Sequence, residues 1–247
     1  MHSGEANWSD PVAFARERLG FEPEEHQARV LQGARRAILN CTRQWGKSTV
    51  SAAMAVHRAY TQPESLIVVV SAAGRQSGEF LLKARTFARQ LGMQPKGDGH
   101  NEMSILFPNG SRIVGLPDSE DTIRGFSKVS LLLIDEASRV SDETYHAVRP
   151  MLAVSNGDLW LMSTPKGRRG FFFTEWTAGT EKWERVLVTA PACPRIPADF
   201  LEAERAKRGD WYYRQEYLCE FVDGEDALFS KESLDRAMRG DFGPLGE

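Results

Sequence analysis

The chain alternates continuous apolar runs with stretches whose apolar residues recur at helical spacing. Residues 50–56 and 73–91 have helical spacing and follow the first two apolar runs. Apolar runs without polar alternation are typical of strands buried on both faces of a parallel sheet. This order predicts an α/β fold with a mainly parallel central sheet flanked by helices. The apolar runs cover residues 37–39, 65–71, 129–134 and 158–162.

Helices and a hairpin complete the predicted pattern. Residues 11–19 and a second segment ending near Leu31 have the spacing of helices and precede the first strand. The apolar runs 103–107 and 111–116 flank an Asn-Gly pair at 109–110. Both residues of such a pair accept positive φ, so we expect an antiparallel hairpin there.

The composition changes after residue 167. Basic and aromatic residues follow, then a strand-like run at 185–188 and a helix expected over 198–207. We interpret this part as a small C-terminal lid subdomain packed on the core, and we expect residues 158–162 to form the last strand of the central sheet. The predicted divisions are 1–35 for an N-terminal helical segment, 36–167 for the core, 168–229 for the lid and 230–247 for a linker.

Composition sets limits on the class of protein. The chain has 247 residues, 41% hydrophobic and 26% charged, which is ordinary for a globular chain. No apolar run approaches the roughly 20 residues that cross a bilayer. The three cysteines are scattered, which indicates reduced thiols in an intracellular protein. The net charge of −3 does not indicate a nucleic-acid partner, so any DNA contact needs a local basic patch or several subunits that each present one.

A candidate anion site lies between the first apolar run and the helix that follows it. A strand, a tight loop and a helix form a phosphate-binding loop, in which backbone N–H groups and the helix dipole face the anion. There Gly46 lets the backbone approach the phosphates, Lys47 reaches the β/γ oxygens and Ser48 ligates Mg²⁺. Cys41 replaces the first glycine of the full pattern, and a helix start capped by Ser48 is the alternative. The stretch reads Thr42, Arg43, Gln44, Trp45, Gly46, Lys47, Ser48 and Thr49.

A second element decides between these interpretations. The apolar run 129–134 ends in two adjacent carboxylates, Asp135 and Glu136. Asp135 can hold Mg²⁺, and Glu136 can orient and deprotonate an attacking water. Together with the Gly-Lys-Ser segment, the two acids predict a phosphate-loop NTPase with a RecA/ASCE-like fold.

Two further polar positions are candidates. Gln27 precedes the loop, and its carboxamide can donate and accept at once, as adenine binding requires. The alternative for Gln27 is a solvated helix residue. Ser163 and Thr164 follow the run 158–162 and can sense whether the γ-phosphate is present, whereas the alternative is an ordinary turn.

Five segments in this order resemble the ATPase domain of the large terminase subunit of tailed double-stranded DNA bacteriophages. The resemblance extends from about Phe21 to Phe229, and this family tolerates the missing first glycine. The segments are 43–48, 123–125, 133–137, 163–167 and 214–217, the last followed by Glu220 and Phe221.

The resemblance implies an ATP-driven motor that uses Mg²⁺ and threads double-stranded DNA into a procapsid. It also implies a homo-oligomeric ring docked on the portal, a small terminase subunit as partner, and action in the host-cell cytoplasm. Full-length members carry a C-terminal nuclease domain as well. Only 18 residues follow Phe229, so nuclease activity is not expected of this chain.

A cation near the γ-phosphate is also expected. The 82 residues after Pro165 are too few for the second full lobe of a two-lobed helicase, so an arginine should come from a nearby loop or a neighbouring subunit. Arg139, three residues after Glu136, is the candidate, and the resemblance favours its action in trans. The alternative is a salt bridge or a solvated cation. Its rivals are Arg124 and, within the same subunit, Arg43.

Two other functions share the predicted site. A helicase-like DNA translocase core would need a partner lobe, and a nucleotide-gated assembly module would have less need of Glu136. Several cations are candidates for DNA contact through backbone phosphates, although a solvated helix face is the alternative for the first set. They are Lys83, Arg85 and Arg89, and Lys166, Arg168 and Arg169.

Overall fold

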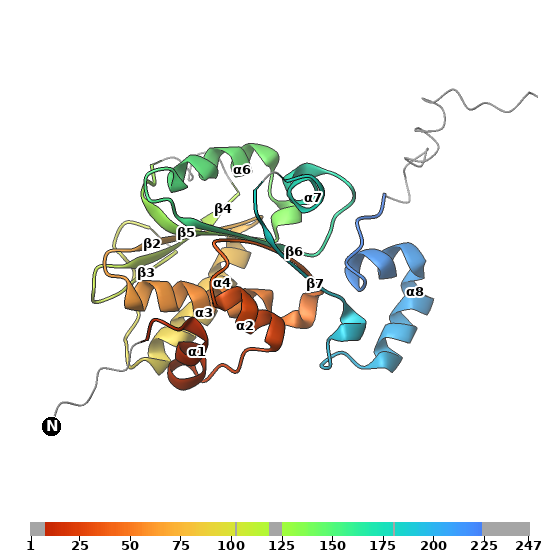
Figure 1. The fold of residues 1–247 in the computed structure, drawn as a ribbon, viewed down its shortest axis with the longest axis horizontal. Coiled ribbons are helices and arrows are strands. Elements are labelled where there is room, and N and C mark those ends of the chain that lie inside the picture. The colour runs from red at the N-terminus through yellow and green to blue at the C-terminus, as the bar shows by residue number, and fades with distance from the viewer. Residues whose placement is uncertain (1–7, 102, 119–124, 180, 224–247) are drawn as a thin grey trace, which may run out of the picture.

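A twisted sheet of seven strands forms the centre of the molecule (Figure 1). The computed structural model describes residues 8–101, 103–118, 125–179 and 181–223. The strand order is β3-β4-β2-β5-β6-β1-β7, and every neighbouring pair is parallel except β3 and β4. The predicted α/β fold with a mainly parallel sheet is confirmed. The strands are β1 Arg36–Cys41, β2 Leu66–Ser71, β3 Ser104–Leu106, β4 Arg112–Pro117, β5 Val129–Asp135, β6 Asp158–Ser163 and β7 Glu184–Val188.

Helices cover both faces of the sheet. On β2, Ile67 and Val69 join the apolar cluster on one face, while Val68 and Val70 join the cluster on the other. Because successive side chains of a strand point to opposite faces, a continuous apolar run is buried on both. The first face carries α1 Pro11–Leu19, α2 Glu25–Leu31, α3 Lys47–Thr61 and α4 Gly74–Gln90; the second carries α6 Asp142–Val148 and α7 Gly170–Thr177.

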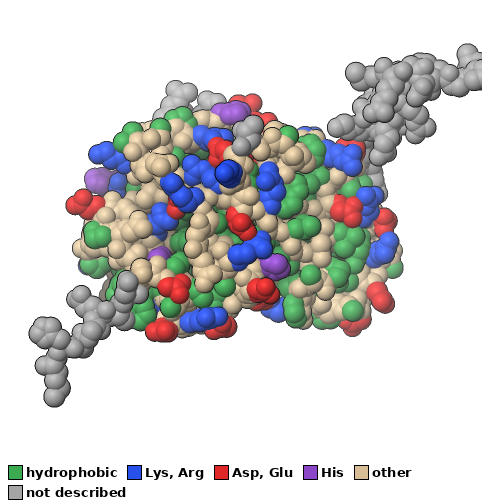
Figure 2. Space-filling model, in the orientation of Figure 1, with side chains coloured by type: hydrophobic (Ala, Val, Ile, Leu, Met, Phe, Trp, Pro, Cys, Tyr) green, Lys and Arg blue, Asp and Glu red, His purple; other side chains and the backbone are tan. Residues whose placement is uncertain are grey.

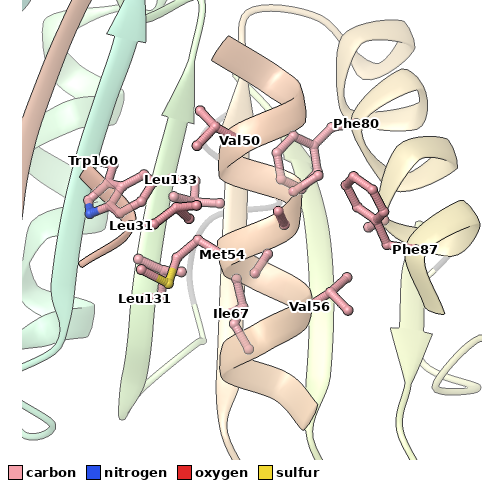
Figure 3. Close-up of a cluster of buried hydrophobic side chains, with 14 of the residues drawn as sticks. Leu31, Val50, Met54, Val56, Ile67, Phe80, Phe87, Leu131, Leu133 and Trp160 are labelled. Carbon is pink, nitrogen blue, oxygen red and sulfur yellow. The ribbon is translucent and has the colours of Figure 1, made fainter. Parts of the chain in front are cut away.

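Helix α3 fixes the position of the loop that precedes it. Figure 3 shows α3 beside α4 and over the strands, with its apolar side chains directed into the core. Val50 and Val56 are fully buried, and Met54 is nearly so. Burying such side chains stabilises the fold by about 1.5–3 kcal/mol each. The N-terminus of α3 is therefore held firmly at the carboxyl edge of the sheet.

The hairpin forms as predicted, but of the two turn residues expected to have positive φ only Gly110 does. β3 and β4 pair antiparallel, and Gly110 has a φ of 84°. The side chain of Asn109 instead donates hydrogen bonds of 2.8 and 3.2 Å to the carbonyls of Ala59 and Tyr60 near the end of α3. The turn thus also satisfies backbone acceptors that the end of α3 leaves free.

The expectation that β6 is the last strand is wrong. β7 pairs parallel with β1, from Ala37 opposite Glu184 to Cys41 opposite Val188. Val186 and Val188 are buried, whereas 51% of Leu187 is exposed, as suits an edge strand with one covered face. β7 therefore belongs to the sheet, and α7 packs on the sheet's second face. The lid predicted over 168–229 stays a prediction, and these two elements within its range pack in or on the central sheet.

The part of the chain that stands beside the sheet begins after β7. Helix α8, Ala198–Glu216, lies past the end of β7 (Figure 1) and is longer than the predicted helix over 198–207. It is kinked at Gly209, whose φ is 80°. A small apolar cluster, built around Ala190, Leu201 and Tyr213, packs this helix against the turn η4 Ala190–Ala192. The predicted linker 230–247 lies outside the described residues, and the other predicted divisions stay predictions.

Candidate active site

The candidate phosphate loop joins β1 to α3 through the 3-10 turn η1 Arg43–Trp45. Gly46 follows this turn with a φ of 96°, a conformation that side-chain-bearing residues rarely adopt. A Cβ at Gly46 would also lie 3.1 Å from the amide nitrogen of Gln27. Gly46, and not Ser48, is the N-cap of α3. The alternative of an ordinary helix start capped by Ser48 is therefore wrong.

Lys47 is buried at the start of α3. Its Nζ donates hydrogen bonds of 2.6 Å to the carbonyl of Cys41 and 3.0 Å to that of Thr42. Burial lowers the pKa of Lys47, while the nearby carboxylates Glu136 and Asp135 act in the opposite direction. The ammonium is thus held over its own loop, with the acidic end of β5 close enough to influence its charge.

Asp135, the last residue of β5, meets the phosphate loop. The Ser48 hydroxyl donates a 3.3 Å hydrogen bond to Asp135 Oδ2, which joins segments 87 residues apart. Burial and then the neighbouring Glu136 raise the pKa of Asp135, and Lys47 opposes that rise. The two segments that the sequence places at one site therefore do converge.

Glu136 follows in a left-handed backbone conformation, with φ 54° and ψ 41°. Its N–H donates a 3.1 Å hydrogen bond to Asp135 Oδ1. A non-glycine residue held in this region costs about 1–3 kcal/mol, and such residues cluster at functional sites. This conformation ends β5, and the turn η2 Ala137–Arg139 begins directly after Glu136.

Ser163, at the tip of β6, is tied to that same turn. Its hydroxyl donates a 2.8 Å hydrogen bond to the Ser138 hydroxyl and accepts a 3.2 Å bond from the Ser138 N–H. The hydroxyl of Thr164 is buried, with no hydrogen-bond partner in the described part of the chain. Ser163 thus positions the turn that carries Arg139, and Thr164 offers a buried hydroxyl beside it.

The two candidate arginines of the site meet at one carboxylate. Arg43 Nε donates a 2.7 Å hydrogen bond to Glu216 Oε2, and Arg139 Nη2 lies 3.8 Å from Glu216 Oε1. Arg139 Nη1 lies 3.7 Å from Glu136 Oε2. The salt-bridge alternative for Arg139 is therefore observed, within its own chain. Arg124, the other predicted candidate, lies outside the described residues.

Sequence reasoning assigned no role to Glu216, although the segment 214–217 contributed to the resemblance. Helix α8 brings Glu216 to the loop, and no local pattern could reveal a contact between residues so distant in sequence. Arg195 was missed for the same reason. Its Nη2 donates a 2.8 Å hydrogen bond to the carbonyl of Trp45, and it also pairs with Glu24 at 3.0 Å.

Gln27 is neither solvated nor free, because only 2% of it is exposed. Its Oε1 accepts from the N–H of Glu24 at 3.0 Å, and its Nε2 donates to the carbonyl of Trp45 at 2.9 Å. Gln27 thus holds the phosphate loop through the Trp45 carbonyl, and its predicted role in adenine binding stays a prediction. In the loop, Trp45 is buried and Gln44 is exposed, while the Thr49 N–H bonds to the Gly46 carbonyl at 2.9 Å.

The oxygen atoms of the site suit Mg²⁺. Ser48 and Asp135 offer a hydroxyl and a carboxylate, the hard donors that this ion prefers, and it usually binds through one or two protein oxygens together with water and substrate phosphates. No group of three or more His, Cys, Asp or Glu side chains with metal-site geometry occurs among the described residues. The arrangement fits a magnesium–triphosphate site better than an all-protein metal cage.

The comparison with protein families agrees with this geometry. Residues 38–236 match the family described as terminase large subunit, T4likevirus-type, N-terminal. The chain belongs to the terminase large-subunit family. This terminase chain is 24% identical over 252 residues to the large terminase subunit of Thermus virus P23-45, covering 87% of the chain and 52% of the relative. It therefore spans about half the length of the curated relatives that it matches.

Solved terminases share the fold of this terminase chain. The large terminase ATPase domain of Thermus phage P74-26 superimposes with a TM-score of 0.75 at 21% identity, over 86% of this chain and 99% of that domain. The HK97 bacteriophage large terminase gives a TM-score of 0.69 at 16% identity, over 87% of this chain and 55% of that one. The large terminase of a thermophilic bacteriophage, solved in complex with ADP, gives 0.66 at 13% identity, over 87% and 53%.

Proposed function

We propose that this chain hydrolyses ATP to drive double-stranded viral DNA into a procapsid. The observation that carries the proposal is the hydrogen bond from Ser48 to Asp135. It joins the phosphate loop to the acidic end of β5 at the N-terminus of α3, where backbone N–H groups and the helix dipole favour an anion. Membership of the terminase family supports the DNA-packaging role.

Each residue of the site has a proposed role. Lys47 exchanges its bonds with two loop carbonyls for the β/γ-phosphate oxygens, and Ser48 and Asp135 hold Mg²⁺. The metal, when bound, neutralises charge that develops on the phosphates. Glu136 orients and deprotonates the attacking water, for which its side chain is 27% exposed at the edge of the site. Ser163 and Thr164 sense the γ-phosphate and pass its state to the turn 137–139.

Arg139 is proposed to act on the nucleotide of its own subunit. It lies beside Glu136 and Glu216 of the same chain, and its side chain is only 28% exposed. The closeness of two carboxylates of its own chain supports action in cis, and action in trans, which the resemblance favours, is the alternative. Arg43, which shares Glu216, is the second cation of the same site. A trans arginine then has to come from another residue of the neighbouring subunit.

DNA, portal, small terminase subunit and a homo-oligomeric ring are proposed partners on the strength of the family. Basic side chains gather in the upper part of the face seen in Figure 2, with acidic ones among them. Of the candidate DNA contacts, Lys83, Arg89, Lys166 and Arg169 are exposed. Arg168 is exposed as well, but it donates a 3.0 Å hydrogen bond to the Phe221 carbonyl, and the partly buried Arg85 donates one of 3.1 Å to the Ser104 carbonyl.

The test is to measure ATP turnover by the chain with Mg²⁺ and then DNA uptake into procapsids that carry portals. The proposal expects turnover in the wild type, its loss in Glu136→Gln, and nucleotide binding that survives in Glu136→Gln but weakens in Lys47→Ala. Equal loss of binding in the two variants would remove Glu136 from the role of base. Absence of turnover by the wild type, even with DNA and procapsids present, would refute the ATPase itself.

A further inference from the structure

The last residue of α8, Glu216, places a buried carboxylate at the edge of the phosphate loop. Its side chain is only 5% exposed, although it ends a helix that stands beside the sheet. One oxygen accepts the 2.7 Å hydrogen bond from Arg43 Nε, and the other lies 3.8 Å from Arg139 Nη2. Glu216 is therefore the point at which α8 contacts both candidate catalytic cations.

The residues around Glu216 dock this end of α8 on three parts of the core. The carbonyl of Glu216 accepts from the Thr42 hydroxyl at 3.4 Å, and Gln215 Oε1 accepts from the Gly167 N–H at 3.1 Å. The carbonyl of Tyr217 accepts from the N–H of Ala190 at 2.7 Å. The end of α8 thus contacts the phosphate loop, the loop after β6 and the turn after β7 at once.

The side chains of two arginines and two glutamates around the end of α8 neutralise one another's charge. Arg43 and Arg139 face Glu136 and Glu216, so two cations meet two carboxylates. The contacts of Arg139 are long, and its Nη1 is a buried donor without a hydrogen-bond partner in the described part of the chain. A buried donor left unsatisfied is unfavourable, and an anionic oxygen within reach would remove that cost. The site therefore favours a further anion at the cost of the contacts to Glu216.

We propose that Glu216 is a positioning residue whose carboxylate competes with the γ-phosphate of ATP for Arg43 and Arg139. ADP lacks this phosphate, so both cations stay on Glu216 and the end of α8 stays docked. ATP draws them away, which leaves a buried carboxylate poorly paired and loosens the end of α8. This inference rests on the proposed function, because it takes the site to bind ATP. It adds to that function a mechanism by which the γ-phosphate changes the docking of α8.

The test is the selectivity between two nucleotides, measured as equilibrium dissociation constants of ADP and ATP-γ-S with Mg²⁺ for the full chain. In Glu216→Gln the competitor is gone while the shape is kept, so ATP-γ-S should bind about tenfold tighter and ADP should change by less than about twofold. Glu220→Gln is the matched control. Glu220 lies on the same segment and pairs with Arg214 at 2.7 Å on the surface, so its loss should leave both constants unchanged.

A double variant tests whether the tighter binding of ATP-γ-S depends on Arg43. Arg43→Gln added to Glu216→Gln should abolish much of the gain for ATP-γ-S, because one of the released cations is then missing. An unchanged ratio of the two constants in Glu216→Gln would overturn the inference, and so would a ratio shifted toward ADP. If the wild type bound neither nucleotide, the proposed function would fail instead, so the two failures are distinguishable.

Hydrogen exchange of the wild type gives an independent measurement that needs no variant to fold. The amide of Leu218, which bonds to the Tyr213 carbonyl at 3.2 Å, lies in the docked segment. Its exchange should be faster with ATP-γ-S than with ADP, because only the former carries the competing phosphate. Equal exchange with the two nucleotides, both at saturating concentration, would overturn the proposal.

Discussion

The phosphate loop and the end of α8 meet at one site but are held there by different forces. The loop is fixed at both ends, by β1, which lies between β6 and the edge strand β7, and by α3, whose apolar face is in the core. The end of α8 is held by a few hydrogen bonds from side chains and backbone and by a small apolar cluster of its own. A densely packed core deforms little, whereas a small cluster with polar contacts opens at low cost. We therefore expect the phosphate loop to keep its shape and the end of α8 to open more readily.

The largest expected effect tests which subunit each arginine serves. Arg139→Ala should lower ATP turnover by about 10³-fold or more, because a cation on the developing γ-phosphate charge is lost. Mixing Arg139→Ala with Glu136→Gln should not restore activity if both residues serve the site of their own chain. Turnover is measured at several protein concentrations. The exposed Arg16→Ala is the control, and any recovery in the mixture would show that Arg139 acts in trans.

Loss of the water-activating carboxylate comes next. Glu136→Gln should lower turnover by about 10²–10⁴-fold, because the amide cannot take a proton. The dissociation constant of ATP-γ-S should stay nearly unchanged, since phosphate binding is proposed to rest on Lys47 and the loop. Glu143→Gln, an exposed carboxylate in the first turn of α6, is the control. A variant that still turned over ATP at a wild-type rate would assign the base to another group.

The strands and the loop were predictable because they are local in sequence. Continuous apolar runs mark β2, β5 and β6, and Gly46 with Lys47 marks the start of α3. The run 185–188 was predicted to be strand-like, but its place in the central sheet was not, because only one face of β7 is buried. Its short run mixes Arg185 and an exposed Leu187 with two buried valines, which is weak evidence for a sheet strand.

The contacts of α8 were not predictable, because they join residues far apart in sequence. Glu216 meets Arg43 across 173 positions, and Arg195 meets Trp45 across 150. No spacing rule covers such pairs, since tertiary packing sets them. The same holds for Arg139, where the sequence gives a cation near Glu136 but not the direction in which its guanidinium points.

A pair of core truncations sharpens the contrast between the two regions. Leu133→Ala, in the middle of β5, should lower the free energy of global unfolding by about 2–5 kcal/mol, because the cavity lies in the main core. Leu201→Ala, in the small cluster under α8, should lower it by no more than about 1–2 kcal/mol and act mainly by local opening. Denaturant unfolding gives the first quantity, and hydrogen exchange of α8 gives the second. Equal global effects would show that α8 unfolds together with the sheet.

Two glycines compare a strained backbone position in the phosphate loop with an unstrained one inside a helix. Gly46→Ala should destabilise the chain by about 1–3 kcal/mol, because its φ of 96° is unfavourable for alanine and the new Cβ meets Gln27. Gly78 lies inside α4, and a Cβ added there would meet no atom within 4 Å. Gly78→Ala should therefore stabilise the folded chain by about 0.5–1 kcal/mol. Denaturant unfolding at fixed pH measures both. A neutral Gly46→Ala would mean that the loop adopts another conformation.

The smallest expected effect is a pH dependence within the sheet-anchored region. His57 on α3 is buried, and its Nε2 lies 2.9 Å from the carbonyl of Trp8. Burial, and then the charge of Arg58, lower the pKa of His57, while the Trp8 carbonyl and Asp10 oppose this. The unfolded chain therefore binds a proton more readily than the folded one, so stability is full above the ordinary histidine pKa and falls as the pH drops through it.

His57→Gln keeps a side-chain donor for Trp8 and removes the titrating ring, so it should flatten the dependence of the unfolding free energy on pH between about 7 and 5. The exposed His146→Gln is the matched control and should leave that dependence unchanged. Stability measured by urea unfolding at several pH values decides between them. A steeper fall in His57→Gln than in the wild type would mean that the imidazole is charged in the folded chain. Helix α3 would then carry a buried cation on the face that packs against the core. The strands alone would have to hold the phosphate loop in place.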